Sequence, residues 1–272
     1  MDDEYIRQAK LEIERWESQG PGFVSQVGDF ILWPAQKAAE LSIPEGLQEA
    51  VAKAIQGFLS GVGSATQLII NEGETRQKVE TLLGEYRDEL KAADAGAKHY
   101  WGWHVGYAAA EGGATGAAGL PGLVADIPLL FTISLRLIQQ MGLCYGYDVT
   151  KEAEQEYVMH ILRTGSTGDI KAKMEFLVGL KQIEQILLKV TWKKMNEAVA
   201  CKEISRLSVL AAMRQFAKSL GIQLTKRKAL QIVPVIGGLV GASFNAVFVN
   251  DVGRASYMSY RRRRITELEE SS

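Results

Sequence analysis

Apolar residues recur along this chain at intervals of three and four, which is the spacing of one face of an α-helix. Ile6, Ala9, Ile13 and Trp16 follow this pattern, and similar runs occupy 79–90, 174–190 and 204–220. No segment shows the alternation of apolar and polar residues that predicts a half-buried strand. The pattern therefore predicts an all-α protein.

Glycine, proline and helix-capping residues interrupt the helical pattern at 20–21, 42–44, 71–73, 112–113, 120–122, 165–168 and 221. Each interruption predicts the end of one helix or the start of the next. We expect a single compact multi-helix domain over residues 21–272, with about eight to ten helices and a glycine-rich central helix pair. Residues 1–20 are expected to form an N-terminal helix that is loosely attached.

Cysteine content and the first residues bear on location. Only Cys144 and Cys201 are present among 272 residues, which argues against a disulfide-stabilised secreted domain. The chain starts Met-Asp-Asp-Glu, which does not resemble a targeting peptide. We expect a cytoplasmic protein, with a peripheral position at the inner membrane face as its alternative location.

The net charge of −1 conceals an uneven distribution of charge along the chain. Residues 1–180 carry 15 basic and 25 acidic side chains, whereas residues 181–272 carry 16 and 7. Two explanations stay open: complementarity within the molecule, or a basic face turned toward anionic lipid. Few aromatic residues accompany the basic ones, so no nucleic-acid partner is expected. The predicted basic surface comprises Lys226, Arg227, Lys228, Arg261, Arg262, Arg263 and Arg264.

Two long stretches carry no formal charge, residues 54–71 and 229–250. The second is long enough to cross a bilayer, but it contains polar residues and both its flanks are basic, which conflicts with a single span. A buried core helix, an interfacial or hairpin membrane contact, and a true span are the three alternatives.

Residues 112–148 are rich in glycine and nearly free of charge. Each glycine inside a helix costs about 1 kcal/mol relative to alanine, so several together need a reason. Tight helix crossing is one reason, and close approach of a ligand, a lipid headgroup or a partner helix is the other. The predicted contact residues are Gly113, Gly116, Gly119, Gly122, Gly237, Gly241 and Asn245.

Asp126, Arg136 and Asp148 are the charged residues of this stretch. Asp126 stands two residues before Pro128, as the N-cap of a new helix would. Arg136 lies between leucines, so we expect it to be buried and paired with a carboxylate: Asp148, Asp251, or Asp126 if the helix is broken. Asp126 and Arg136 cannot pair along one straight helix, because ten residues separate them by about 15 Å.

Catalytic motifs are missing from the sequence. There is no nucleophile elbow, phosphate-binding loop or dinucleotide fingerprint, and His99, His104 and His160 lack zinc-site spacing. We expect no metal and no cofactor. One enzymatic alternative is a carboxylate-based hydrolase that uses Asp126, Asp148 and Asp251 around Arg136, and it requires these four side chains to converge.

Two separated motifs resemble the signatures of EcsC family proteins. The first is GAAGLPGLVADIP at 116–128, continued by Leu-Arg at 135–136, Ile-Gln-Gln at 138–140 and Tyr-Gly-Tyr-Asp at 145–148. The second comprises Pro-Val-Ile-Gly at 234–237, Gly241, Asn245, Phe248 and Tyr-Arg at 260–261. The resemblance covers roughly 75–265 and implies a bacterial, cytoplasmic protein near the membrane, with an ABC exporter as a partner. It implies no reaction.

Together these observations favour a non-catalytic helical accessory protein that contacts a membrane surface, a lipid or a membrane-protein partner. The hydrolase remains one alternative. The other is an interaction module that self-associates through Gly237, Gly238 and Gly241.

Overall fold

The computed structural model describes residues 2–19, 70–166 and 234–271, with the isolated positions 49, 50, 53, 54, 57, 174, 177 and 178. Every regular element in these residues is a helix, which confirms the all-α class for this part of the chain. The helices are α1 (Asp3–Ser18), α4 (Glu72–Tyr86), α5 (Glu89–Ala117), α6 (Gly119–Cys144), α7 (Glu152–Ser166) and α10 (Pro234–Glu270).

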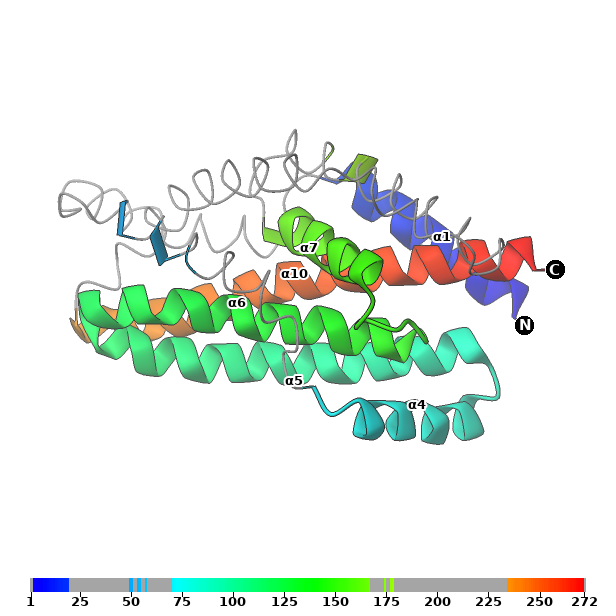
Figure 1. The fold of residues 1–272 in the computed structure, drawn as a ribbon, viewed down its shortest axis with the longest axis horizontal. Helices are drawn as coiled ribbons and strands as arrows, with labels where there is room; N and C mark the ends of the chain where they lie inside the picture. Colours follow the sequence, from blue (N-terminus) through cyan, green and yellow to red (C-terminus); the bar gives the residue numbers. More distant parts are fainter. Residues whose placement is uncertain are drawn as a thin grey trace.

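Three long helices, α5, α6 and α10, lie side by side along the long axis of the molecule (Figure 1). Helix α10 runs antiparallel to α5, since Arg264 contacts Glu89 while Arg261 contacts Asp94. It runs parallel to α6, since Phe248 packs on Phe131 while Tyr260 stacks on Tyr145. Residues 234–250 of the uncharged stretch form the first part of α10, where Phe244, Phe248 and Val249 are buried.

Polar side chains define where several helices begin. The Asn71 side chain accepts a hydrogen bond from the Glu74 amide at 3.1 Å at the start of α4, and Asp88 accepts one from the Lys91 amide at 3.0 Å at the start of α5. Such caps satisfy amides that a helix leaves without partners. The break predicted at 71–73 is therefore confirmed.

The break predicted at 112–113 is wrong, and the one predicted at 120–122 lies one residue from the observed helix start. Helix α5 continues through both glycines to Ala117, and α6 begins at Gly119, so the chain reverses at Ala118 alone. A Cβ atom added to Gly122 would lie 2.0 Å from the Thr115 carbonyl oxygen. Glycine is required at 122 because α6 approaches the backbone of α5 too closely for a side chain.

Helix α1 is firmly held, contrary to the expected loose attachment of residues 1–20. Ile6, Ala9, Ile13 and Trp16 are all buried, as their spacing predicts. Ion pairs join α1 and its cap to four other positions: Lys10 to Glu269, Asp2 to Lys91, Glu12 to Arg261, and Glu17 to Arg262. The reason is that α1 combines an apolar face with acidic partners for the basic C-terminal helix.

Candidate functional site

Arg261, on α10, is buried with 3% of its side chain exposed. Its Nε lies 2.7 Å from Asp94 Oδ2, and its Nη1 donates a hydrogen bond to Glu12 Oε2 at 2.6 Å. The guanidinium also lies 5.2 Å from the ring centroids of both Tyr5 and Tyr257. Burial alone would lower the pKa of Arg261, but Asp94 and Tyr257 more than compensate, so the guanidinium stays charged.

Asp94 joins α1, α5, α6 and α10 at one point. Its carboxylate accepts hydrogen bonds from the Tyr5 hydroxyl at 2.6 Å and from the Tyr145 hydroxyl at 2.5 Å, and it pairs with Arg261. Burial raises the pKa of Asp94, while the Arg261 charge and the tyrosine hydroxyls limit that rise. A buried carboxylate with this many partners within the protein stabilises the packing of the helices and is not typical of a catalytic group.

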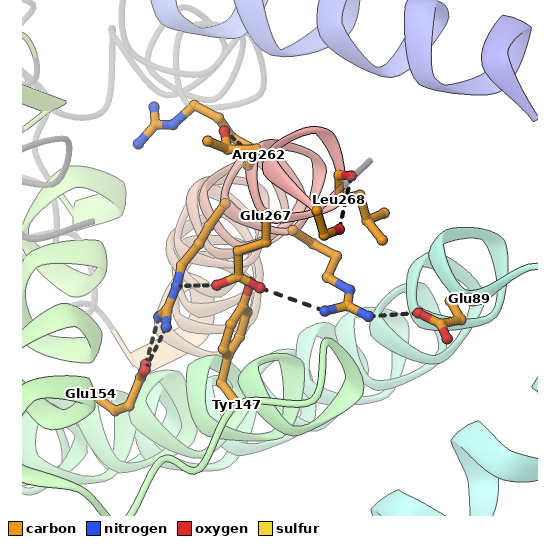
Figure 2. Close-up of polar contacts among 10 residues, drawn as sticks. Glu89, Tyr147, Glu154, Arg262, Glu267 and Leu268 are labelled. Atoms are coloured by element: carbon orange, nitrogen blue, oxygen red, sulfur yellow. Dashed lines mark hydrogen bonds and ion pairs between the residues drawn. The ribbon is translucent and has the colours of Figure 1, made fainter. Parts of the chain in front are cut away.

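Arg263 forms a second buried pair. Its Nη1 and Nη2 donate hydrogen bonds to the two oxygens of Glu154 at 2.8 and 2.7 Å, and its guanidinium lies 3.8 Å from the Tyr147 ring centroid. Glu267 lies between this pair and Glu89, with the Tyr147 side chain below it (Figure 2). Burial would lower the pKa of Arg263, and the hydrogen bonds to Glu154 together with Tyr147 raise it overall.

The two remaining arginines are also paired. Arg262 points away from the cluster in Figure 2 and pairs with Glu17 of α1. Arg264 pairs with Glu89 at 2.6 Å and with Glu267 at 3.5 Å.

The predicted basic surface is therefore wrong for residues 261–264. Consecutive residues on a helix point about 100° apart, so these four arginines reach acidic partners on three surrounding helices, α1, α5 and α7. Complementarity within the molecule is the explanation that holds for them. Lys226, Arg227 and Lys228 lie outside the described residues.

Asp126 is not an N-cap. It lies in the interior of α6, which continues through Pro128, and its side chain is fully buried. Asn245 Nδ2 donates a hydrogen bond to Asp126 Oδ1 at 2.8 Å. The first sequence motif thus meets the second, and Asn245 has a partner within the protein.

Arg136 is exposed rather than buried, and no carboxylate among the described residues forms an ion pair with it. It belongs to the outward stripe of α6, which includes Ala125, Leu129, Thr132 and Gln140 at spacings of three and four. The leucines on either side of it face other directions because neighbouring helical residues do not share a face.

The four residues of the hydrolase alternative do not converge. Asp148 follows α6, where its carboxylate accepts hydrogen bonds from the amide and hydroxyl of Thr150. Asp126 lies near the other end of that helix, which separates the two by about 27 Å or more. The described residues hold no group of three metal-ligating side chains.

One end of the three-helix core is almost free of charge. Residues 101–117 of α5 carry only Glu111, residues 119–135 of α6 carry only Asp126, and residues 234–250 of α10 carry no charge. We call these three segments the charge-poor end. They lie together, at the left of Figure 1, because α10 is antiparallel to α5 and parallel to α6. Each spans about 25 Å, close to the thickness of a bilayer hydrocarbon core.

The charge-poor end displays aromatic side chains to solvent. Trp103 is 59% exposed and Tyr107 44% exposed. Their rings stack in parallel, with centroids 5.5 Å apart. Uncharged exposed positions continue the same face of α5, and we call the whole set the aromatic strip: Gly102, Trp103, Gly106, Tyr107, Ala110, Ala114 and Ala117.

Comparison with known proteins identifies the family of the chain. It matches the EcsC protein family over residues 7–265. The chain belongs to this family. It is 26% identical over 275 residues to the uncharacterized protein YdbA of Bacillus subtilis (strain 168), covering 97% of this chain and 94% of that protein. It is 22% identical over 225 residues to Protein EcsC of the same organism, covering 83% of this chain and 82% of that protein. No solved structure matches it.

The EcsC-family resemblance in the two motifs is thereby confirmed, and the match extends to residue 7, beyond the motifs. Of the predicted contact glycines, Gly116 and Gly122 are buried and Gly113 is half-buried. The surroundings of Gly119, Gly237 and Gly241 lie outside what the structure describes.

Sequence reasoning did not identify the aromatic strip. Its signal was present as the spacing of four between Trp103 and Tyr107, in a segment with a single charge. Periodicity alone does not tell whether such a face is buried or exposed.

Within the described residues, one helical segment, Ala125–Cys144, is long and apolar enough to cross a membrane by length and composition. Most of it is buried inside the protein, as in the core helix of a soluble domain. The aromatic strip of α5, in contrast to this segment, faces outward.

Proposed function

We propose that this EcsC-family chain is a non-catalytic helical accessory protein whose charge-poor end contacts a lipid bilayer. The separation of charge along the bundle is the observation that carries the proposal. One end holds the paired arginines, and the other holds Glu111, Asp126 and an exposed aromatic pair.

The aromatic strip has the chemistry of a membrane interface. Tryptophan and tyrosine concentrate at the boundary between hydrocarbon and water, where an apolar ring with a polar edge is stable. Covering on the order of 150 Å² of Trp103 and Tyr107 would contribute about 4 kcal/mol at 25 cal/mol per Å². That is enough for reversible attachment.

Interactions inside the charge-poor end suit a low-dielectric environment. Asn245 donates a hydrogen bond to Asp126 across α10 and α6, and His104 of this end contacts Gln140, which lies just beyond it on α6, at 2.5 Å. Burial lowers the pKa of His104, so this imidazole is neutral near pH 7. The glycine-rich pairing of α5 and α6 allows close backbone approach, which small residues also provide in membranes. A membrane protein such as an ABC exporter would meet this chain at the same surface.

Vesicle flotation tests the proposal. Purified protein is mixed with phosphatidylethanolamine/phosphatidylglycerol vesicles in low and high salt. We expect the wild type to float at both salt concentrations, because the contact is apolar. The vesicle-bound fraction of Trp103→Glu/Tyr107→Glu should be at least tenfold smaller than that of the wild type. The matched control is Leu11→Glu/Leu83→Glu, which places charges on side chains 47% and 39% exposed on α1 and α4. This control should float like the wild type.

The outcomes are distinct. If the wild type does not float, or if the control loses binding as fully as the aromatic variant, bilayer contact through this end is refuted. A dimer in solution that the aromatic variant disperses would instead identify self-association as the use of the surface.

A further inference from the structure

Helix α7 contains an arginine that differs from the arginines of α10. Arg163 is 2% exposed, and its Nε and Nη2 are buried without a hydrogen-bond partner. No carboxylate among the described residues forms an ion pair with it, although Glu156 is near enough to act on its charge. Burial lowers the pKa of Arg163, yet a guanidinium stays protonated at neutral pH.

The two atoms without partners form one edge of the guanidinium. Nε and Nη2 point their hydrogens in parallel, and this edge grips two oxygens of one oxyanion. Arg263 shows the alternative in the same protein, where Nη1 and Nη2 grip the two oxygens of Glu154. In Arg163 both nitrogens of the Nε–Nη2 edge are buried and donate no hydrogen bond.

His160 lies one turn earlier on the same face of α7. It is half-buried, and its Nδ1 is likewise buried without a hydrogen-bond partner. Burial and the charge of Arg163 lower the pKa of His160 to about 4, so the ring is neutral and donates from one nitrogen. Arg163 and His160 therefore carry three buried nitrogens without hydrogen-bond partners within one turn of α7, and the His160 side chain is itself partly exposed.

We propose that Arg163 and His160 bind an oxyanion, the phosphate or carboxylate group of a small ligand or a phospholipid headgroup. A buried guanidinium that forms no ion pair with any described residue carries a large desolvation penalty, which an oxyanion bound to its Nε–Nη2 edge would offset. The site is independent of the aromatic strip, since it lies on α7 rather than on α5.

Thermal unfolding with and without ligand tests this site. The probes are sodium phosphate, sodium acetate and glycerol 3-phosphate, each compared with sodium chloride at equal ionic strength. Arg163→Met removes the charge while keeping the length of the side chain. Arg136→Met is the matched control, because Arg136 is an arginine on the exposed face of α6.

We expect a saturating oxyanion to raise the midpoint of the wild type and of Arg136→Met by roughly 5 °C, and to leave Arg163→Met unchanged. Without ligand, Arg163→Met should be as stable as the wild type or more so, because a buried unpaired charge has been removed. A rise with glycerol 3-phosphate alone would identify a headgroup, and a rise with inorganic phosphate a free anion.

Two results would overturn the site. An equal rise in all three proteins would indicate an adventitious ion only. A ligand-free Arg163→Met that unfolds several degrees below the wild type would show that a carboxylate of the chain itself already neutralises Arg163.

Discussion

Replacing Arg263 by methionine tests whether the C-terminal arginines are structural. Arg263 and Glu154 have only 4% and 7% of their side chains exposed, and they share two hydrogen bonds of 2.8 and 2.7 Å. Removing one partner of such a pair leaves a buried charge and costs about 3–5 kcal/mol. Methionine keeps most of the side-chain volume, so little of that loss arises from a cavity.

The expected result is a fall in the unfolding midpoint. For a domain of this size each kcal/mol corresponds to about 2–4 °C, so Arg263→Met should unfold roughly 10 °C below the wild type. Differential scanning calorimetry measures the change. The double variant Arg263→Met/Glu154→Leu should recover much of the loss, since no unpaired charge remains.

An exposed pair provides the control. Arg7 and Glu4 form an ion pair of 2.6 Å with 71% and 55% of their side chains exposed, so Arg7→Met should leave the midpoint nearly unchanged. If Arg263→Met behaves like Arg7→Met, the pair is not buried in solution. The basic-surface interpretation of residues 261–264 would then return.

Two further predictions concern α7. The pKa of His160 falls to about 4 in the folded protein from an ordinary value of 6.5, chiefly through burial, so its neutral form contributes stability that is complete above pH 6.5 and is lost as the pH falls toward 4. Over this pH interval the free energy of unfolding of His160→Gln, measured by chemical denaturation, should fall by about 3 kcal/mol less than that of the wild type. If the two free energies fall equally with pH, His160 is not buried in solution. Gly165→Ala should lower the midpoint of thermal unfolding, because its Cβ would lie 2.5 Å from the Val252 Cα. Gly106→Ala should raise it slightly, because nothing lies within 4 Å of the added Cβ. A rise in both variants would refute the close contact of α7 with α10.

Local patterns predicted the features that local physics determines. The buried face of α1 follows from four apolar residues at helical spacing, and the cap at Asn71 follows from a side chain that accepts from its own helix. Both depend on neighbours within one or two turns. The interruption at 112–113 was misinterpreted because glycine marks both a helix end and a close helix crossing. The close crossing at Gly122 depends on the Thr115 carbonyl opposite it, which the local pattern does not reveal.

Interactions over long sequence separation were harder to predict. Asp126 has the local context of a cap, and its actual partner, Asn245, lies 119 residues away. Arg136 has the local context of a buried residue, and its exposure depends on which stripe of α6 the other helices leave uncovered. The two motifs contain a partial signal, because Asp126 belongs to the first and its partner Asn245 to the second.

The run Arg261–Arg264 shows how a sequence feature and its structural role differ. Four consecutive cations are typical of a surface that binds anions, but a helix distributes them over its whole circumference. The acidic surplus of residues 1–180 was the signal that their partners lay within the chain. These arginines form ion pairs with Glu12, Glu17, Glu89 and Glu154. The C-terminal end of α10 therefore offers few unpaired positive charges to anionic lipid. The membrane contact that we propose therefore does not use these arginines, and it depends instead on the apolar surface that the aromatic strip displays at the opposite end of the bundle.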